Sequence, residues 1–192
     1  MRAKQLAFIS FMVFLLLLIG LLIFTIDWGG SEAKEEVVVK QLVLHELSET
    51  PATVTFLKSG PIVADSKHRE LLITVNNAEI VAQIIQGYEG TVIKTSRFAN
   101  NAAAYQAFLA ALEDIYFNNS RIYTGARTSE GSCPTGRRYT YTLKNAYEFD
   151  FETWGNSCNK DTGTFAGSNS QVEQLFKAQV PNIQDLTKSQ QL

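Results

Sequence analysis

The chain has 192 residues and a formal net charge of −2, and 45% of its residues are hydrophobic while 19% are charged. These values fit one globular domain of ordinary size once the apolar N-terminus is set aside. The basic residues are scattered and form no long run, so the composition argues against a nucleic-acid partner.

The first predicted element is an apolar segment over residues 6–26, which contains no charged side chain. A helix rises 1.5 Å per residue, so this segment would span about 31 Å, the thickness of a bilayer core. We therefore predict a short cytoplasmic tail and a transmembrane anchor within residues 1–26. A signal peptide cleaved after Ala33 is the alternative, although its apolar core is normally shorter, about 7–15 residues.

Flanking charges predict the orientation of this anchor. Arg2 and Lys4 precede it, whereas acidic residues outnumber Lys34 in the polar stalk predicted over residues 27–36. The positive-inside rule then places the N-terminus in the cytoplasm and the rest of the chain outside, as in a single-pass protein of the cell membrane. Without Arg2 and Lys4, 15 basic residues remain against 19 acidic ones, so the exported part carries a net charge of −4.

The exported domain is expected over residues 37–180, and it begins with strand signals. Residues 37–47 are apolar enough to be ordered, but their period fits a strand and a helix equally. The run TVTFLK, residues 53–58, is rich in β-branched side chains and predicts a strand that ends at Ser59-Gly60-Pro61.

Residues 69–85 predict a β-hairpin with a two-residue type I′ turn at Asn76-Asn77, because asparagine tolerates the positive φ that this turn needs. The turn makes one face of the hairpin apolar by pairing Val75 with Ala78, Ile73 with Ile80 and Leu71 with Ala82. The run TVIKTS, residues 91–96, predicts a further strand of the same meander.

In residues 100–119 the apolar side chains recur at helical spacing, not at every second position as in a strand. This spacing predicts one amphipathic helix of about four turns, capped by Asn100 or Asn101 and ended near Asn118. The side chains on its apolar stripe are Tyr105, Phe108, Leu109, Leu112, Ile115 and Tyr116. A capping box formed by Ser170 and Glu173 predicts a short last helix, and residues 181–192 are predicted to be a flexible tail.

The only two cysteines, Cys133 and Cys158, bound a predicted second hairpin. Because an exported domain lies in an oxidising compartment, they favour a disulfide over thiol chemistry. A two-residue turn would set the cysteines opposite each other, but it would mix aromatic and carboxylate side chains on one face. A three-residue loop keeps the faces separate and requires a bulge or a loosened strand end, which Gly155 or Gly136 can supply, and we prefer it. It pairs Leu143 with Tyr147, Tyr141 with Phe149 and Tyr139 with Phe151.

These elements predict an α+β fold class. An N-terminal transmembrane helix is followed by one domain with an antiparallel β-meander, a packed amphipathic helix, a disulfide-closed β-hairpin and a short C-terminal helix.

The sequence contains no strong catalytic, metal-binding or cofactor-binding motif. A row of carboxylates on one strand face consists of Glu148, Asp150 and Glu152, and a solvated face partly neutralised by Arg138 explains it better than a calcium or acid–base site. The only histidines, His45 and His68, lack the spacing of zinc ligands. The hairpin aromatics between Tyr139 and Trp154 are more typical of a core than of a ligand platform. We therefore expect no cofactor, no metal and no enzymatic activity.

Two short motifs carry a resemblance to a known family. The first is FLKSGP, residues 56–61, and the second is YTYTL, residues 139–143. Over roughly residues 53–180 the chain resembles the emfourin-like inhibitors of thermolysin-type metalloproteases and their exported relatives. Those domains have Phe-x-Arg-Ser-Gly-Gly in the first motif, so Lys58 and Pro61 depart from the pattern. The resemblance implies an α+β inhibitor that binds a protease through exposed loops.

The segment from Ser59 to His68 is the most unusual piece predicted to be exposed, and an ordinary hairpin connection is the alternative interpretation. The residues that we predict for partner binding are Lys58, Ser59, Gly60, Pro61, Ile62, Val63 and Asp65. The expected function is a membrane-anchored, non-enzymatic extracytoplasmic binding module of the protease-inhibitor kind. Alternatives are a structural subunit of a cell-envelope assembly and a hydrolase that uses Glu148, Asp150 or His68.

Overall fold

The computed structural model describes residues 15, 43–125, 128–145, 150–188, 190 and 192. The chain divides into two compact units, Met1–Gln41 and Leu42–Leu192, and the strands and helices named below belong to the second. Among the described residues, no helix is both long enough and apolar enough to cross a membrane. The predicted anchor over residues 6–26 lies outside these residues apart from Leu15, and the predicted stalk over residues 27–36 lies outside them entirely.

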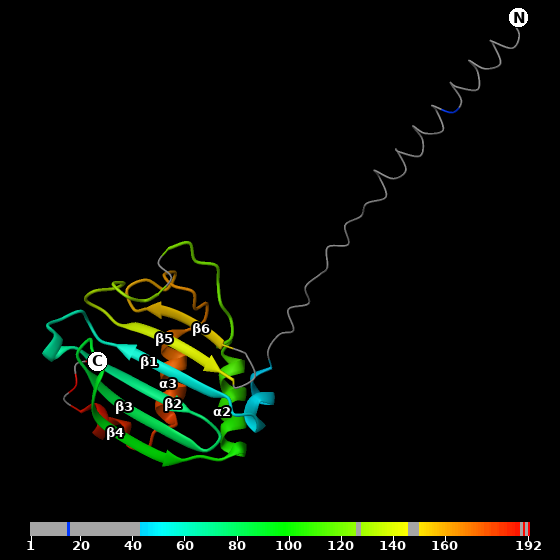
Figure 1. The fold of residues 1–192 in the computed structure, drawn as a ribbon, viewed down its shortest axis with the longest axis horizontal. Coiled ribbons are helices and arrows are strands. Elements are labelled where there is room, and N and C mark those ends of the chain that lie inside the picture. The colour runs from blue at the N-terminus through cyan, green and yellow to red at the C-terminus, as the bar shows by residue number, and fades with distance from the viewer. Residues whose placement is uncertain (1–14, 16–42, 126–127, 146–149, 189, 191) are drawn as a thin grey trace, which may run out of the picture. The chain divides into compact units, whose positions relative to one another are not determined.

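Six antiparallel strands form one sheet in the order β4-β3-β2-β1-β5-β6 (Figure 1). The strands are β1 (Thr53–Ser59), β2 (Arg69–Val75), β3 (Glu79–Gln86), β4 (Thr91–Ala99), β5 (Arg138–Lys144) and β6 (Asp150–Asn156). The first four form the predicted meander. The second hairpin, β5–β6, joins the same sheet beside β1, which the sequence did not predict.

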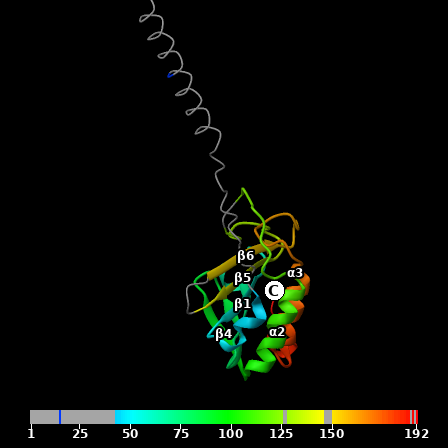
Figure 2. The ribbon, with the colours of Figure 1, turned by 90° about the vertical axis from the view of Figure 1, so that its right-hand side faces the viewer.

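The two longer helices, α2 (Ala102–Asp114) and α3 (Asn169–Ala178), lie side by side behind the sheet of Figure 1, and Figure 2 shows them on one face of it. The shorter helical elements are η1 (Leu44–Glu49), η2 (Asp65–Lys67) and α4 (Ile183–Thr187). We call the face under α2 and α3 the helix face and the other one the open face. The α+β class is therefore confirmed.

Alternation along the strands builds the core on the helix face. Phe56 of β1 stacks on Tyr139 and Tyr141 of β5, with ring centroids 6.3 and 5.8 Å apart, and on Phe176 of α3 at 5.3 Å. Its own side chain is fully buried. Because aromatic pairs add stability beyond the area that they bury, this cluster ties the hairpin β5–β6 to β1 and α3.

Helix α2 confirms the predicted helix and its cap. The Asn101 side chain accepts a hydrogen bond from Ala104 N at 2.9 Å, as an N-cap residue does. The helix ends at Asp114, however, so the prediction that it continues to residue 118 was wrong. Tyr116 adopts a positive φ of 60° and is 65% exposed, so it does not belong to the buried stripe.

The first hairpin forms, but its turn lies one residue later than predicted. The pairs are Val75 with Ile80, Ile73 with Ala82 and Leu71 with Ile84. Asn76 does not take positive φ, and its Oδ1 instead accepts hydrogen bonds from Ala78 N and Glu79 N. This side-chain turn competes with the type I′ geometry. Each partner shifts by two residues, so the apolar face stays the same.

The second hairpin has a different register from either predicted one. Its pairs are Leu143 with Phe151, Tyr141 with Thr153 and Tyr139 with Gly155, so each partner lies four residues beyond the preferred one. The predicted partners Tyr147 and Phe149 lie outside the described residues. The predicted bulge near Gly155 or Gly136 is absent from the described ladder, which runs without interruption from Arg138 to Lys144.

The predicted disulfide between Cys133 and Cys158 is confirmed, with Cα atoms 5.6 Å apart. Both cysteines lie outside the strands, and Cys133 takes a positive φ of 49°. Of the two predicted alternatives, a loosened strand end fits this arrangement better than a bulge, because loop backbone brings the sulfur atoms together.

The C-terminal part departs from its prediction in two ways. Ser168, not Ser170, is the N-cap residue of α3, and Glu173 bonds two lysines instead of forming the predicted capping box. In place of a flexible tail, helix α4 follows and buries Ile183 and Leu186 against the core. Apolar residues at spacing i, i+3 were the missed signal, in a segment too short for a clear period.

Candidate functional site

The predicted binding residues occupy two different environments. Lys58 and Ser59 are the last residues of β1, and both are buried, as is Gly60. Beyond them the chain emerges, with Pro61 and Val63 half-buried and with Ile62 and Asp65 exposed. The exposed part of the predicted segment is thus the stretch from Ile62 to Lys67, which we call the docking loop.

Lys58 points to the helix face, away from the docking loop. It lies opposite Tyr139, and its Nζ donates a 2.7 Å hydrogen bond to Glu173 Oε1 on α3, which Lys177 also contacts at 2.6 Å. Burial lowers the pKa of Lys58, although Glu173 opposes that shift. Burial would raise the pKa of Glu173, but hydrogen bonds from Lys177 and Lys58 outweigh it and hold that pKa below its usual value.

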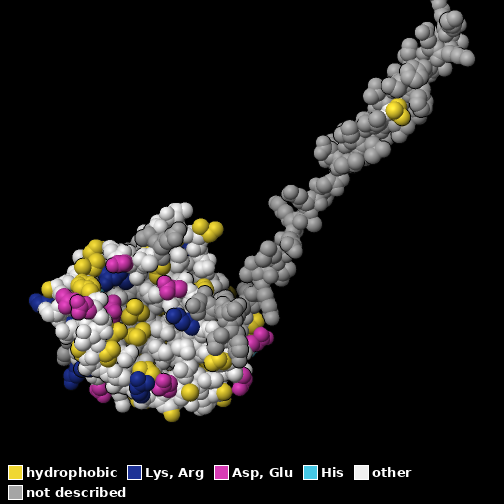
Figure 3. Space-filling model, in the orientation of Figure 1, with side chains coloured by type: hydrophobic (Ala, Val, Ile, Leu, Met, Phe, Trp, Pro, Cys, Tyr) yellow, Lys and Arg dark blue, Asp and Glu magenta, His cyan; other side chains and the backbone are white. Residues whose placement is uncertain are grey.

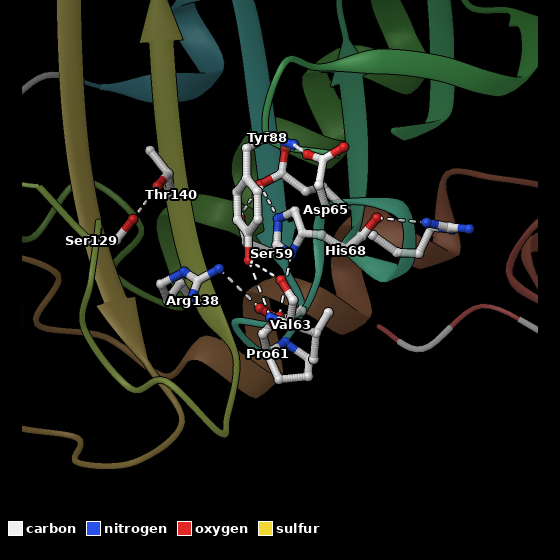
Figure 4. Close-up of polar contacts among 12 residues, drawn as sticks. Ser59, Pro61, Val63, Asp65, His68, Tyr88, Ser129, Arg138 and Thr140 are labelled. Atoms are coloured by element: carbon white, nitrogen blue, oxygen red, sulfur yellow. Dashed lines mark hydrogen bonds and ion pairs between the residues drawn. The ribbon is translucent and has the colours of Figure 1, made fainter. Parts of the chain in front are cut away.

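Tyr88, in the β3–β4 connection, holds the docking loop from one side (Figure 4). Its hydroxyl donates to Val63 O at 2.8 Å and accepts from Val63 N at 3.1 Å, while its backbone N donates to Asp65 Oδ1 at 2.7 Å. The Tyr88 ring also stacks on the buried His68 ring, with centroids 4.2 Å apart. Tyr88 therefore bonds the loop to the β3–β4 connection at Val63 and Asp65.

The disulfide region holds the loop from the other side. Ile62 N donates a 2.7 Å hydrogen bond to Pro134 O, directly after Cys133. Ile62 itself remains 44% exposed. The loop is thus anchored on both sides while it presents an apolar side chain to solvent.

A pocket of about 510 Å³ lies behind the docking loop on the open face of the sheet. Its floor is a cross-strand row in which Ser59 of β1 lies between Glu70 of β2 and Arg138 of β5. The remaining lining residues are Leu57, Ile62, His68, Tyr88, Thr128, Ser129, Glu130 and Gly131. Figure 3 views this face and shows acidic and basic side chains dispersed over it, not gathered into one charged patch.

Arg138 is the unusual member of this row because its side chain is only 6% exposed. Its Nη2 donates to Gly60 O at 2.9 Å, and Figure 4 shows the guanidinium reaching toward the segment from Ser59 to Val63. Its Nη1 has no hydrogen-bond partner within the described part of the chain. Arg138 was expected to neutralise part of the carboxylate row of the hairpin, but it lies opposite Asn156, whereas Glu152 of that row lies opposite Thr142.

Ser59, His68 and Glu70 come together, but not in the order that hydrolysis requires. The Ser59 hydroxyl donates to Glu70 Oε1 at 2.6 Å, and His68 Nε2 lies 3.3 Å from the same oxygen. In a catalytic triad the histidine stands between the nucleophile and the carboxylate. Here the carboxylate stands in the middle, and His68 is 1% exposed, so the arrangement gives the hydrolase alternative no support.

The other candidates from the sequence do not converge on this pocket. Glu152 is exposed, while Glu148 and the side chain of Asp150 lie outside the described residues. His45 pairs with Glu113 at 2.8 Å, and neither residue lines the pocket. The described residues contain no group of three or more His, Cys, Asp or Glu side chains suited to a metal ion.

The hairpin aromatics divide between the two faces. Tyr139 and Tyr141 are buried in the core, and Phe151 packs against it. Trp154 lies on the open face opposite Thr140, where it is buried beneath Tyr123 in an edge-to-face contact at 5.6 Å. None of these described side chains forms an exposed platform.

Sequence reasoning missed Glu70, Tyr88 and Arg138 as parts of one site. A weak signal was present, because Glu70 and Arg138 are charged residues at the beginning of β2 and β5. Their proximity depends on β5 pairing with β1, which no local pattern encodes.

Comparison with known proteins adds no family. No protein-family model matches the chain, and no curated protein matches it in sequence. The docking loop and the pocket behind it are therefore the features of the described chain that point to a function.

Proposed function

We propose that this protein is a membrane-anchored, non-enzymatic binding module, and that its domain outside the cytoplasm docks a protein partner through the docking loop, residues 62–67. The observation that carries the proposal is an exposed Ile62 on a loop with both sides bonded to the rest of the domain. A loop ordered before binding loses less conformational entropy on association, which favours affinity. The disulfide supports an oxidising compartment, and the apolar segment over residues 6–26 supports the anchor.

A thermolysin-type metalloprotease is the partner class that the resemblance of FLKSGP and YTYTL to the emfourin-like inhibitors suggests. The buried Lys58 does not reach such a partner, so Ile62 would supply the main apolar contact. The test measures residual activity of a panel of these proteases with the full chain in nanodiscs at micromolar concentration. Inhibition of one member supports this version, and full activity of every member contradicts it.

Two matched variants test the docking loop itself. Ile62→Asp places a charge on the loop, and Ile93→Asp places the same charge on β4, where the isoleucine is similarly exposed at 41% against 44%. The proposal predicts that Ile62→Asp weakens partner binding at least tenfold, whereas Ile93→Asp leaves it unchanged. Equal binding by both variants would contradict docking through the loop.

A second candidate function is a structural subunit of a cell-envelope assembly. Strand β4 supports it, because this edge of the sheet carries Val92 and Ile93 at 46% and 41% exposure. An exposed strand edge offers unpaired backbone groups to another strand. Crosslinking in native membranes separates the two candidates. If Ile93→Asp loses a partner that Ile62→Asp keeps, this candidate is favoured over the docking loop.

A further inference from the structure

We infer that the pocket behind the docking loop binds a small carboxylate that also carries a hydrogen-bond donor, either a free amino acid or the carboxyl end of a peptide. This inference goes beyond the docking of a protein partner, since it assigns a ligand to the open-face pocket of about 510 Å³ and not to the exposed loop. It is supported by the buried guanidinium of Arg138, in which one terminal nitrogen is hydrogen-bonded and the other has no partner among the described residues.

The guanidinium determines the charge of the ligand. Arg138 is 6% exposed, its Nη2 is bonded to Gly60 O, and its Nη1 lacks a partner among the residues that the structure describes. A buried donor without an acceptor is destabilising, and the loss is larger for a charged group. Because arginine keeps its charge in proteins and its planar fork matches a carboxylate, an anionic oxygen is the most favourable partner.

Acidic neighbours limit the charge that the pocket accepts. Glu70 and Glu130 line the same pocket as Arg138. A multiply charged anion such as phosphate would meet repulsion from both carboxylates, whereas a carboxylate brings a single negative charge. A ligand donor directed at Glu70 would turn that repulsion into a hydrogen bond, since a carboxylate has acceptor capacity beyond its contacts with Ser59 and His68.

The spacing of the row limits the size of the polar part of the ligand. Glu70 and Arg138 flank Ser59 on the two neighbouring strands, so their backbones are about 9–10 Å apart. The side chains reach back across this distance, because Glu70 accepts from the Ser59 hydroxyl and Arg138 Nη2 donates to Gly60 O, so both charged ends lie over the end of β1. A carboxylate and an N–H group on the same or an adjacent carbon atom suit two such neighbouring groups, as in an amino acid or the last residue of a peptide.

The pocket walls suit an aliphatic side chain. Leu57, Ile62 and the Tyr88 ring contribute the apolar part of the lining. The opposite wall is the segment from Thr128 to Gly131, where the side-chain contact from Ser129 to Thr140 is long, at 3.4 Å. Because an O–H···O hydrogen bond is normally about 2.5–3.0 Å long, this contact holds the wall only weakly.

Calorimetry on the full chain in nanodiscs tests the ligand class with five probes: leucine, acetate, inorganic phosphate, the peptide Ala-Ala-Leu and its C-terminal amide. We expect leucine or the free-acid peptide to bind at least tenfold more tightly than acetate, phosphate and the amide. Binding of leucine alone identifies a free amino acid, and tighter binding of the peptide identifies a peptide end. Absence of binding by both, or phosphate binding as tight as theirs, overturns the inference.

Variants then test the residues. Arg138→Met should weaken binding about 10–100-fold, the loss expected for a hydrogen bond to a charged group, and Arg97→Met on the exposed part of β4 is the matched control. Equal affinity of the two folded variants overturns the inference. If Arg138→Met does not fold, Glu70→Gln decides: affinity for leucine or peptide must fall toward that of acetate, and unchanged affinity overturns the inference. The small probes need no protein partner, so their measured affinities do not depend on whether the docking loop binds one.

Discussion

Replacing Glu173 by Gln tests how the buried charges under helix α3 contribute to folding. Lys58 donates to Glu173 at 2.7 Å, and the two side chains are 9% and 15% exposed. Glutamine preserves the shape and an acceptor oxygen, but it removes the only negative charge that the structure shows bonded to Lys58 among the described residues. The variant therefore leaves Lys58 buried beside Lys177 without a compensating charge.

The expected loss follows from this geometry. Removing one partner of a fully buried ion pair costs about 3–5 kcal/mol. Since Lys58 keeps slight exposure and glutamine keeps an acceptor, we expect about 2–3 kcal/mol for Glu173→Gln. For a domain of about 150 residues this corresponds to a fall in Tm of roughly 4–12 °C. Lys58→Met is the matched variant, and it should cost less than about 1 kcal/mol because Glu173 keeps Lys177 at 2.6 Å.

The pH dependence gives an independent check. The pKa of Glu173 is held below its usual value of 4.5, so its contribution is present above that pH and is lost as the pH falls through the folded-state pKa. Burial lowers the pKa of Lys58 below its usual value of 10.5, so the destabilisation caused by its buried charge is present at low pH and is lost as the pH rises toward 10.5. Urea unfolding at pH 7 and at pH 3 measures the contribution of Glu173. Equal losses from Glu173→Gln and Lys58→Met at pH 7, or a loss from Glu173→Gln that does not shrink at pH 3, would refute the reasoning.

Further predictions concern the docking loop and its support. Reducing the disulfide, which closes 26 residues, should destabilise the domain by about 3–4 kcal/mol, and a melting scan showing no shift would contradict this. Gly87→Ala should destabilise the domain more than Gly90→Ala. Both glycines have positive φ, but only at Gly87 would a Cβ meet the Asp65 carboxylate, at 2.9 Å, and displace it from Tyr88 N. Equal chemical denaturation midpoints would count against that contact. Tyr88→Phe should leave Tm within a few degrees but speed amide exchange in the loop, because the hydroxyl bonds Val63 on both sides; unchanged exchange would show that the hydroxyl does not order the loop.

The faces of the strands could be predicted from the sequence, but the turns could not. Both hairpin registers were wrong by an even number of residues, which is why Tyr139 and Tyr141 still lie in the core. Alternation fixes which side of a strand is apolar, whereas the pairing depends on the turn. At Asn76 the side chain accepts two backbone hydrogen bonds, and this local competition shifted the turn.

The site was less predictable than the fold because its residues come from distant segments. Alternation alone assigns Lys58 and Ser59 to opposite faces of β1. Lys58 therefore pairs with Glu173 on the helix face, while Ser59 lies in the pocket floor on the open face. That Arg138 lies beside Ser59 follows from the insertion of β5 next to β1, a long-range pairing. The disulfide was predictable from cysteine count and expected compartment, but its connection to Ile62 through Pro134 was not.

Affinity for a captured partner, compared between Ile62→Asp and Ile93→Asp in the full chain, tests the central claim most directly. The account predicts at least a tenfold loss of affinity for Ile62→Asp and none for Ile93→Asp, since only Ile62 stands on the loop that is bonded on both sides. Unchanged affinity in Ile62→Asp would contradict it and would move the search for the partner surface away from residues 62–67.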